Sequence, residues 1–265
     1  RAPMLHGLAG QQTGVAVTYA RLVPKQMGQE FDAVFDGCVI GGFDGINVTY
    51  PYKERVVRQV SIEDPLVQAI GAVNTVLFRP EGPQGFNTDY TGFVAAYRAA
   101  RGKAAPGICC LIGTGGVGRA LAFALVALGA EEIRLVDINA ARAEALAADI
   151  RAGAYQVPVR TFDDAGAAVN GASGVLNGTP VGMVGHPGSP VPAAALAGAG
   201  WAFDAVYTPV DTRFLGEAQA AGAQVISGYE LFFFQGVHAW DHFAGLPLDQ
   251  AALRADLMKA AAENG

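Results

Sequence analysis

The stretch ICCLIGTGGVG, residues 108–118, decides the fold of this chain. It consists of a short apolar run and a glycine-rich turn that opens a helical pattern extending to Leu128. A second apolar run, residues 133–136, follows and ends at Asp137. A strand, a glycine turn, a helix and a second strand in this order predict a βαβ unit with parallel strands.

The glycine turn has the spacing G-x-G-x-x-G at a strand-to-helix junction. Binding of a dinucleotide at such a junction needs glycine for a tight turn, for close approach of the backbone to the pyrophosphate and for close helix packing. Asp137 ends the second strand, where an acidic residue can bond an adenosine ribose. A glycine-rich connection that binds nothing stays an alternative. The context predicts a dinucleotide site formed by Gly113, Gly115, Gly116, Val117 and Gly118.

The alternation of helix and strand continues on the C-terminal side of this unit. A helix is expected over residues 141–150, and apolar runs indicate strands at residues 155–159, 174–177, 202–206 and 224–226. Short apolar strands between helices are typical of a parallel sheet that is covered on both faces. Residues 101–228 are therefore expected to form a Rossmann-type nucleotide-binding domain.

A first α/β domain is expected over residues 1–100. Its elements are a helix and two strand-like segments, at residues 31–38, 45–50 and 72–77. A helical pattern at residues 90–101 leads into the second domain, and helices within residues 229–265 are expected to pack back on the first. The predicted fold class is α/β with two domains.

Composition excludes several classes of protein. With 51% hydrophobic residues the chain is expected to fold, and its charge of −6 without a Lys/Arg cluster argues against a nucleic-acid partner. The uncharged stretch at residues 165–203 is broken by proline, glycine and asparagine, so we expect no membrane span there. The cysteines are few and odd in number, and adjacent Cys109 and Cys110 should point to opposite faces of a strand. This usage suits a reducing cytoplasm.

Three polar runs precede the glycine turn: NVTYPYKE at residues 47–54, GAVNT at 71–75 and NTDYTG at 87–92. Each alone has an ordinary structural interpretation. Lys53 could be a solvated surface residue and Asn74 a turn residue, while Thr88 or Asp89 could cap the helix that follows.

Together, in this order ahead of a Rossmann pattern, these runs resemble the shikimate dehydrogenase family. The resemblance continues with NGTPVGM at residues 177–183, DAVYTP at 204–209 and Gln235 in the helix after Gly228, so it covers nearly the whole chain. RAPMLH at residues 1–6 and HPG at 186–188 look most like the quinate/shikimate dehydrogenase branch. The resemblance implies hydride transfer between a nicotinamide cofactor and a secondary hydroxyl of a cyclic polyol carboxylate, as in aromatic amino acid biosynthesis.

The resemblance also implies roles for single residues. Oxidation of an alcohol needs a group that takes the hydroxyl proton, and Lys53 is the candidate, with Asp89 holding the lysine and the hydroxyl. A neighbouring carboxylate would raise the pKa of a lysine, so any depression must come from desolvation. The first domain would bind this small-molecule substrate, through Asn47, Thr49, Asn74 and Gln235, with Tyr207 reaching it from the cofactor side. Interdomain packing is the alternative for Tyr207 and Gln235.

The cofactor expected is NAD. Relatives that use NADP end the second strand of this domain with N-R-T, and here those positions are Asp137, Ile138 and Asn139. A carboxylate accepts bonds from ribose hydroxyls but repels a 2′-phosphate. A mere capping role for Asp137 is the alternative. Further cofactor contacts are implied at Arg142, Thr179, Val181, Val206 and Gly228. Arg142 could lie over the adenine or pair at the surface with Glu144 or Asp149.

Other features leave the substrate and assembly open. The family holds the substrate carboxylate with two hydroxyls near its N-terminus, and one of these positions is Ala2 here. A diverged substrate, an aminated analogue or another carbonyl compound, and a noncatalytic dinucleotide sensor therefore stay alternatives.

His238 and His242 have the spacing of a helical metal pair, but Ala239 replaces the acidic base of that motif, so we expect surface or capping histidines and no metal. The aromatic run at residues 231–234 is predicted to be buried core, and a homodimer is compatible with the sequence.

Overall fold

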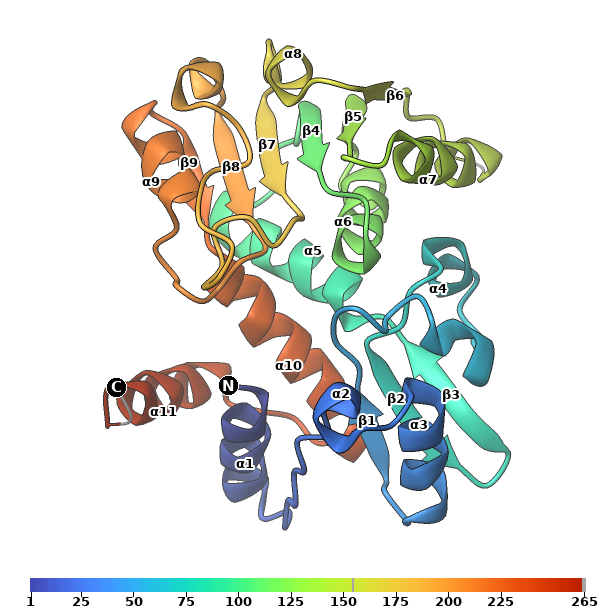
Figure 1. Cartoon of the computed structure of the whole chain (residues 1–265). Coiled ribbons are helices and arrows are strands. Elements are labelled where there is room, and N and C mark those ends of the chain that lie inside the picture. Colours follow the sequence, from blue (N-terminus) through green and yellow to red (C-terminus); the bar gives the residue numbers. More distant parts are fainter. Residues whose placement is uncertain (154, 264–265) are drawn as a thin grey trace.

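The computed structural model describes residues 1–153 and 155–263 and contains two sheets, with helices α5 (Thr88–Arg101) and α10 (Gly228–Ala244) between them (Figure 1). The first sheet is antiparallel, in the order β1-β2-β3. The elements of this first part are α1 (Ala2–Thr13), α2 (Pro24–Met27), α3 (Phe31–Ile40), β1 (Gly45–Asn47), the 3-10 turn η1 (Val56–Gln59), α4 (Pro65–Ile70), β2 (Thr75–Arg79) and β3 (Gly82–Phe86).

The second sheet is parallel, with six strands in the order β6-β5-β4-β7-β8-β9. The chain enters this sheet at its central strand β4. It then forms β5 and β6 on one side and β7, β8 and β9 on the other, which is the doubly wound order of nucleotide-binding sheets. Its elements are β4 (Ile108–Ile112), α6 (Gly116–Ala127), β5 (Glu132–Val136), α7 (Ala140–Ala152), β6 (Val159–Phe162), α8 (Ala165–Val169), β7 (Gly174–Asn177), η2 (Ala193–Leu196), β8 (Trp201–Asp204), α9 (Arg213–Ala220) and β9 (Gln224–Ile226).

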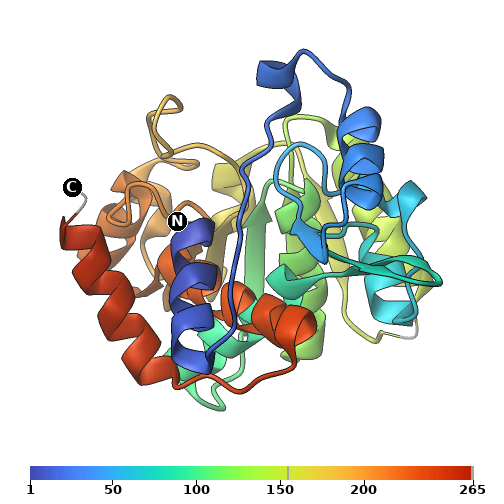
Figure 2. The same cartoon turned by 90° about the horizontal axis from the view of Figure 1, so that it is seen from below.

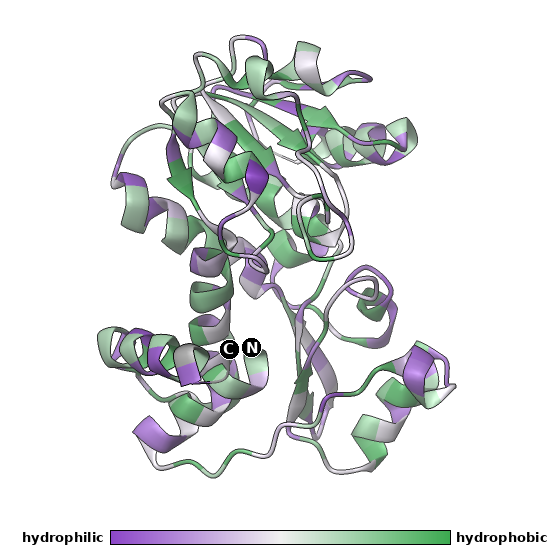
Figure 3. Cartoon of the chain, turned by 60° about the vertical axis from the view of Figure 1, so that its left-hand side comes forward, coloured by the Kyte–Doolittle hydropathy of each residue, from purple (hydrophilic) through white to green (hydrophobic). Residues whose placement is uncertain are grey.

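Both faces of the parallel sheet are covered, and its central strands β4, β7 and β8 are buried and largely apolar (Figure 3). Residues of α5, α6 and α7 cover one face, and residues of α8, η2 and α9 cover the other. Cys109 belongs to the first of these clusters and Cys110 to the second, so the adjacent cysteines point to opposite faces as expected.

The small sheet brings the polar runs together at one end. Asn47 pairs with Thr75 across β1 and β2, and Thr75 pairs with Phe86 across β2 and β3. Helix α5 begins directly after β3. Asn47, Asn74 and Asp89 therefore lie toward the same end of this sheet although they are far apart in sequence.

The helices at the two ends of the chain pack together. Figure 2 shows α1 and α11 (Gln250–Glu263) side by side, and a cluster that includes Leu5, Phe233 and Leu257 joins both to α10. In the aromatic run, Leu231, Phe232 and Phe233 are at most 5% exposed, as predicted, whereas Phe234 is half-buried. In the part of the chain that the structure describes, no helix is long and apolar enough to cross a bilayer.

Several predicted elements are misplaced. The strand expected at residues 155–159 starts only at Val159, because Pro158 has no N–H for the ladder and Tyr155 is used for core packing. The strand expected at 202–206 ends at Asp204, opposite the end of β7, and the one expected at 72–77 is β2 at Thr75–Arg79. The sequence pattern did not reveal α1, α4, α8 or β3.

Candidate active site

Lys53 and Asp89 form an ion pair, with Nζ and Oδ2 2.6 Å apart. Lys53 comes from the irregular segment after β1, and Asp89 lies in the first turn of α5. Their side chains are only 12% and 6% exposed, so the charges are largely removed from water. A β-carbon on Gly116 would lie 3.0 Å from Cβ of Lys53, so the lysine packs against the glycine turn of the second sheet.

Asn74 fixes the start of α5. Its Oδ1 accepts a hydrogen bond from the backbone N–H of Thr88 at 2.8 Å, and its Nδ2 donates to the Thr88 hydroxyl at 3.0 Å. The side chain that caps α5 is Asn87, which accepts from the N–H of Tyr90, and neither Thr88 nor Asp89 does so. The carboxylate of Asp89 is therefore free to meet Lys53.

The other expected substrate-binding residues come from different elements. Thr49 is exposed after β1, and the side chain of Asn47 is half-buried. Gln235 on α10 lies against Gly92 of α5, where a β-carbon would come within 2.8 Å of its backbone nitrogen. The Tyr207 ring stacks on Phe232 at 5.2 Å. Burial raises the pKa of Tyr207, while Arg1 opposes this increase and Asp89 adds to it.

Tyr19 is a site residue that the sequence reasoning missed. It lies in the irregular segment between α1 and α2, and its hydroxyl donates to Oδ1 of Asn47 at 3.0 Å. No motif marks it, because its segment has neither regular periodicity nor a recognisable spacing.

The glycine turn leaves room for a dinucleotide. A β-carbon on Gly118 would collide with the carbonyl oxygen of Gly113, and Gly113 has φ +92°, so both glycines are needed by the turn itself. A β-carbon on Gly115 would meet only the Arg142 guanidinium, at 3.7 Å. Open space next to backbone at a helix N-terminus fits a bound pyrophosphate.

Asp137 is tied to this turn. Its Oδ2 accepts hydrogen bonds from the N–H and hydroxyl of Thr114 at 2.7 and 2.8 Å, and its Oδ1 accepts from the N–H of Asn139. Burial acts to raise the pKa of Asp137, but the hydrogen bonds from Asn139 and Thr114 outweigh it and lower the pKa. The group is thus a carboxylate at neutral pH. The neighbouring Ile138 side chain is fully exposed.

Arg142 makes a different contact from either pairing considered in the sequence. Its guanidinium forms an ion pair with Glu54 at 2.5 Å, while Asp149 pairs with Arg119 and Glu144 lies near Arg151. Glu54 follows Lys53 directly. The ion pair therefore connects α7 with the segment that carries the lysine.

A buried network supports the loops at the carboxyl ends of β7 and β8. Asp204 accepts hydrogen bonds from Asn177 Nδ2, the Thr212 hydroxyl and the N–H of Val206, and Asn177 in turn accepts from Thr179. Burial raises the pKa of Asp204 to about 6 although these hydrogen bonds act in the opposite direction. The Thr179 hydroxyl accepts from the N–H of Val181, so the network orders the expected cofactor contacts Thr179, Val181 and Val206. Gly228 packs against the carbonyls of Asp204 and Val206, where a side chain would not fit.

The two histidines of α10 are half-buried rather than exposed, whereas His186 is exposed. His238 is half-buried with Nδ1 2.8 Å from the Thr91 hydroxyl, and the His242 ring stacks on Phe86 at 3.9 Å. Both connect α10 with neighbouring elements, because α10 packs along α5 and the small sheet. His6 is 4% exposed.

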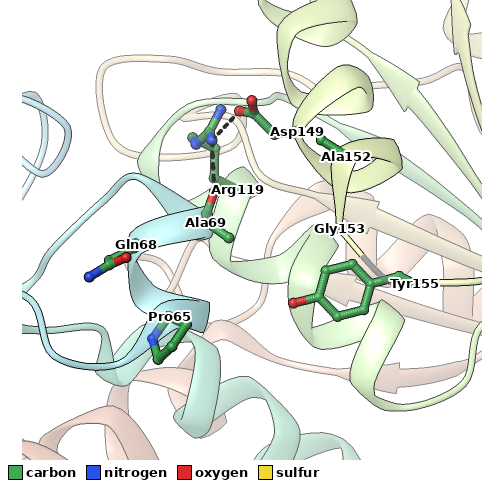
Figure 4. Close-up of a pocket in the computed structure, with 8 residues that line it drawn as sticks. All are labelled: Pro65, Gln68, Ala69, Arg119, Asp149, Ala152, Gly153 and Tyr155. Carbon is green, nitrogen blue, oxygen red and sulfur yellow. Dashed lines mark hydrogen bonds and ion pairs between the residues drawn. The ribbon is translucent and has the colours of Figure 1, made fainter.

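A separate cavity of about 440 Å³ lies between α4 and the helices α6 and α7 (Figure 4). Arg119 crosses it, donating to the carbonyls of Ala69 and Ile70 and pairing with Asp149 at 2.6 Å. A cation at the C-terminus of a helix is favourable, so Arg119 ties α4 to the nucleotide-binding sheet. The cavity contains none of the expected site residues.

A doubly wound sheet with a glycine turn, and a Lys–Asp pair presented to that turn by a second sheet, define a two-part dehydrogenase that uses a nicotinamide dinucleotide. A family model described as "Shikimate dehydrogenase substrate binding domain" matches residues 1–76. A quinate/shikimate dehydrogenase (NAD⁺) of Corynebacterium efficiens is 34% identical over 264 residues, with 97% of this chain and 93% of the relative covered.

Solved structures agree with this classification. Quinate dehydrogenase from Corynebacterium glutamicum in complex with NAD superposes with a TM-score of 0.88 and 32% identity, covering 97% of this chain and 94% of that one. Shikimate 5-dehydrogenase from Thermus thermophilus in complex with NADP(H) and shikimate gives 0.84 and 33%, covering 98% and 94%. The chain belongs to the shikimate dehydrogenase family and is an oxidoreductase acting on CH–OH groups.

Proposed function

We propose that this chain transfers a hydride between NAD and a secondary hydroxyl of shikimate or quinate, with Lys53 and Asp89 as the catalytic pair. The observation that carries the proposal is the position of the Lys53–Asp89 ion pair against Gly116 of the glycine turn. A proton acceptor and the cofactor turn are thereby brought into one site, as oxidation of an alcohol requires.

In this mechanism Lys53 takes the hydroxyl proton during oxidation and returns it during reduction. Asp89, 2.6 Å from Nζ, holds the lysine and can bond the same hydroxyl. When bound, the nicotinamide of NAD accepts or returns the hydride. Asn47, Thr49, Asn74, Gln235 and Tyr207 are proposed to orient the ring by its remaining hydroxyls and its carboxylate. In Asn74 the oxygen and one donor are already used by Thr88, so only its second N–H could reach a ligand.

The choice of NAD rests on Asp137 and Ile138. The Asp137 carboxylate lies at the glycine turn, where ribose hydroxyls can donate to it and a 2′-phosphate would meet like charge. Ile138 offers no cation to such a phosphate. Relatives include enzymes of both cofactor types. We propose that these two residues set the preference of this chain.

The division into domains is part of the proposal. We assign residues 1–100 and 229–265 to substrate binding and residues 101–228 to NAD binding, supported by the separate antiparallel and parallel sheets. A homodimer and a cytoplasmic location stay predictions of the sequence.

A diverged substrate is the second candidate, because Ala2 lacks the hydroxyl that the family uses for the carboxylate. Loss of one such hydrogen bond costs about 1–3 kcal/mol if nothing replaces it. The test is steady-state reduction of NAD with shikimate, quinate and their aminated analogues, with Lys53→Ala as the inactive control. Turnover of shikimate or quinate supports the proposal. Preference for an aminated analogue would favour divergence, and cofactor binding without any turnover would favour a sensor.

A further inference from the structure

The amide of Asn47 is held on its oxygen side. Tyr19 donates from its hydroxyl to Oδ1 of Asn47 at 3.0 Å. Burial raises the pKa of Tyr19 to about 12, so the phenol keeps its proton and remains a donor over the whole neutral range. The other side of the same amide is the donor Nδ2.

His6 also contacts the Asn47 side chain. Burial lowers the pKa of His6 to about 4, and a hydrogen bond with that side chain acts to raise it. The ring is neutral near pH 7, so it adds no charge to the substrate site.

Aromatic rings pack around His6, which stacks on Tyr19. The His6 ring stacks on Tyr19 with centroids 5.5 Å apart, and Trp240 and Phe243 lie 6.2 and 5.6 Å from His6. His6 belongs to α1, and both aromatic residues belong to α10. Helix α1 therefore packs directly on this tyrosine of an irregular segment, and α10 supports it through His6.

We propose that Tyr19 is a positioning residue that orients the Asn47 amide so that its nitrogen donates to an oxygen of the bound substrate. An amide side chain offers one accepting and one donating group, and the use of the oxygen by Tyr19 leaves the donor for the ligand. This assignment rests on the proposed function, in which a polyol carboxylate supplies the accepting oxygen. Tyr19 itself need not touch the substrate.

The experiment is a double-mutant cycle of Tyr19→Phe with Asn47→Ala. In Tyr19→Phe the KM for shikimate or quinate should rise roughly 3- to 10-fold, the loss expected for one neutral hydrogen bond, with kcat and the KM for NAD nearly unchanged. In the Asn47→Ala background, Tyr19→Phe should have no further effect, because the amide that it orients is gone. A full effect in that background would show direct contact with substrate and overturn the proposal, as would an unchanged KM in the single variant.

Tyr229→Phe is the matched control. It also removes a buried hydroxyl, but within the described chain that hydroxyl has no hydrogen-bond partner, so KM should stay unchanged. Should the wild-type enzyme turn over neither polyol carboxylate, the proposed function fails, and nuclear magnetic resonance still tests Tyr19. The side-chain NH₂ signals of Asn47, assigned by their loss in Asn47→Ala, should shift in Tyr19→Phe and not in Tyr229→Phe. Unshifted signals in Tyr19→Phe would contradict the orientation role.

Discussion

Lys53 is constrained from three directions. Its ammonium meets Asp89 at 2.6 Å, its backbone carbonyl accepts from the N–H of Val73, and its β-carbon packs on Gly116. These contacts place one amine between the small sheet and the glycine turn. Removal of the amine should therefore slow the chemical step and leave the structure of the dinucleotide turn intact.

Lys53→Ala should lower kcat by about 10²- to 10⁴-fold, the usual contribution of a general acid–base group, with little change in the dissociation constant for NAD. Asp89→Asn should do the same to a smaller degree. Single-turnover kinetics and cofactor titration by fluorescence measure the two quantities. Near-normal turnover of Lys53→Ala would remove the lysine from the mechanism.

Asp137→Asn combined with Ile138→Arg should shift cofactor preference from NAD toward NADP, because a carboxylate is removed and a guanidinium is placed where a 2′-phosphate would lie. The comparison is kcat/KM for both cofactors in the parent and the double variant. A parent enzyme that uses NADP as well as NAD would refute the electrostatic argument. An unchanged ratio in the double variant would show that these positions do not set the preference.

The motifs predicted which residues gather at the site, but not all that each side chain does there. Asn74 binds Thr88, and Asn87 rather than Thr88 or Asp89 caps α5, since these contacts depend on how β2 and β3 pair. Tyr19 could not be found, because it reaches Asn47 only through the packing of α1 and α10 behind it.

At the scale of elements, the loops after β7 and β8 depend on one buried acid. Asp204 is fully buried, and its raised pKa of about 6 compares with 3.8 for a free aspartate. The folded state thus holds the proton more tightly than the unfolded chain. This contribution to stability is complete below about pH 4 and is lost as pH rises through about 6.

Asp204→Asn should abolish that dependence. An asparagine could still accept from Asn177 and Val206 and donate to the Thr212 hydroxyl, so the network should survive. From pH 4 to pH 7 the free energy of unfolding of the wild type should fall relative to the variant by roughly 3 kcal/mol at most. Urea denaturation of both proteins across this range measures the difference. Parallel stability profiles would mean that Asp204 titrates normally.

Elements with a strong hydrophobic pattern were predicted at the right place, and the elements that were misplaced or missed have a physical reason. β4 and β7 match because they are apolar strands in the middle of the sheet and are bounded by turns, and the edge strand β9 also matches. β6 was misplaced because it is an edge strand with polar residues such as Arg160, and β3 was missed because its sequence, GPQGF, contains glycine and proline. Pairing with a neighbouring strand outweighs local propensity in both cases.

For the molecule as a whole, two arginines of the nucleotide-binding part contact the segments around the small sheet. Arg142 forms an ion pair with Glu54 beside Lys53, and Arg119 donates hydrogen bonds to the backbone carbonyls at the end of α4. Glu54 and Arg142 are about half exposed, at 43% and 45%, and such a pair contributes about 0–1 kcal/mol. A contact this weak can break and form during catalysis.

We expect the two parts to close on each other when NAD and substrate are both bound, because Lys53 and the cofactor turn belong to different parts. Small-angle scattering should show a smaller radius of gyration with both ligands. Glu54→Gln should be more open than the wild type without ligands and equal to it with them. No change on ligand binding would contradict hinge closure.

The most direct test of the proposed hydride transfer follows the hydride itself. Shikimate and quinate carrying deuterium on the carbon of the oxidised hydroxyl are incubated with NAD and the enzyme, and the cofactor product is analysed by mass spectrometry. If the enzyme transfers this hydride, the wild type forms reduced NAD that carries the deuterium. Lys53→Ala should form the same product at least about 100-fold more slowly. Reduced NAD without deuterium, or no reduced NAD from either compound, would contradict it.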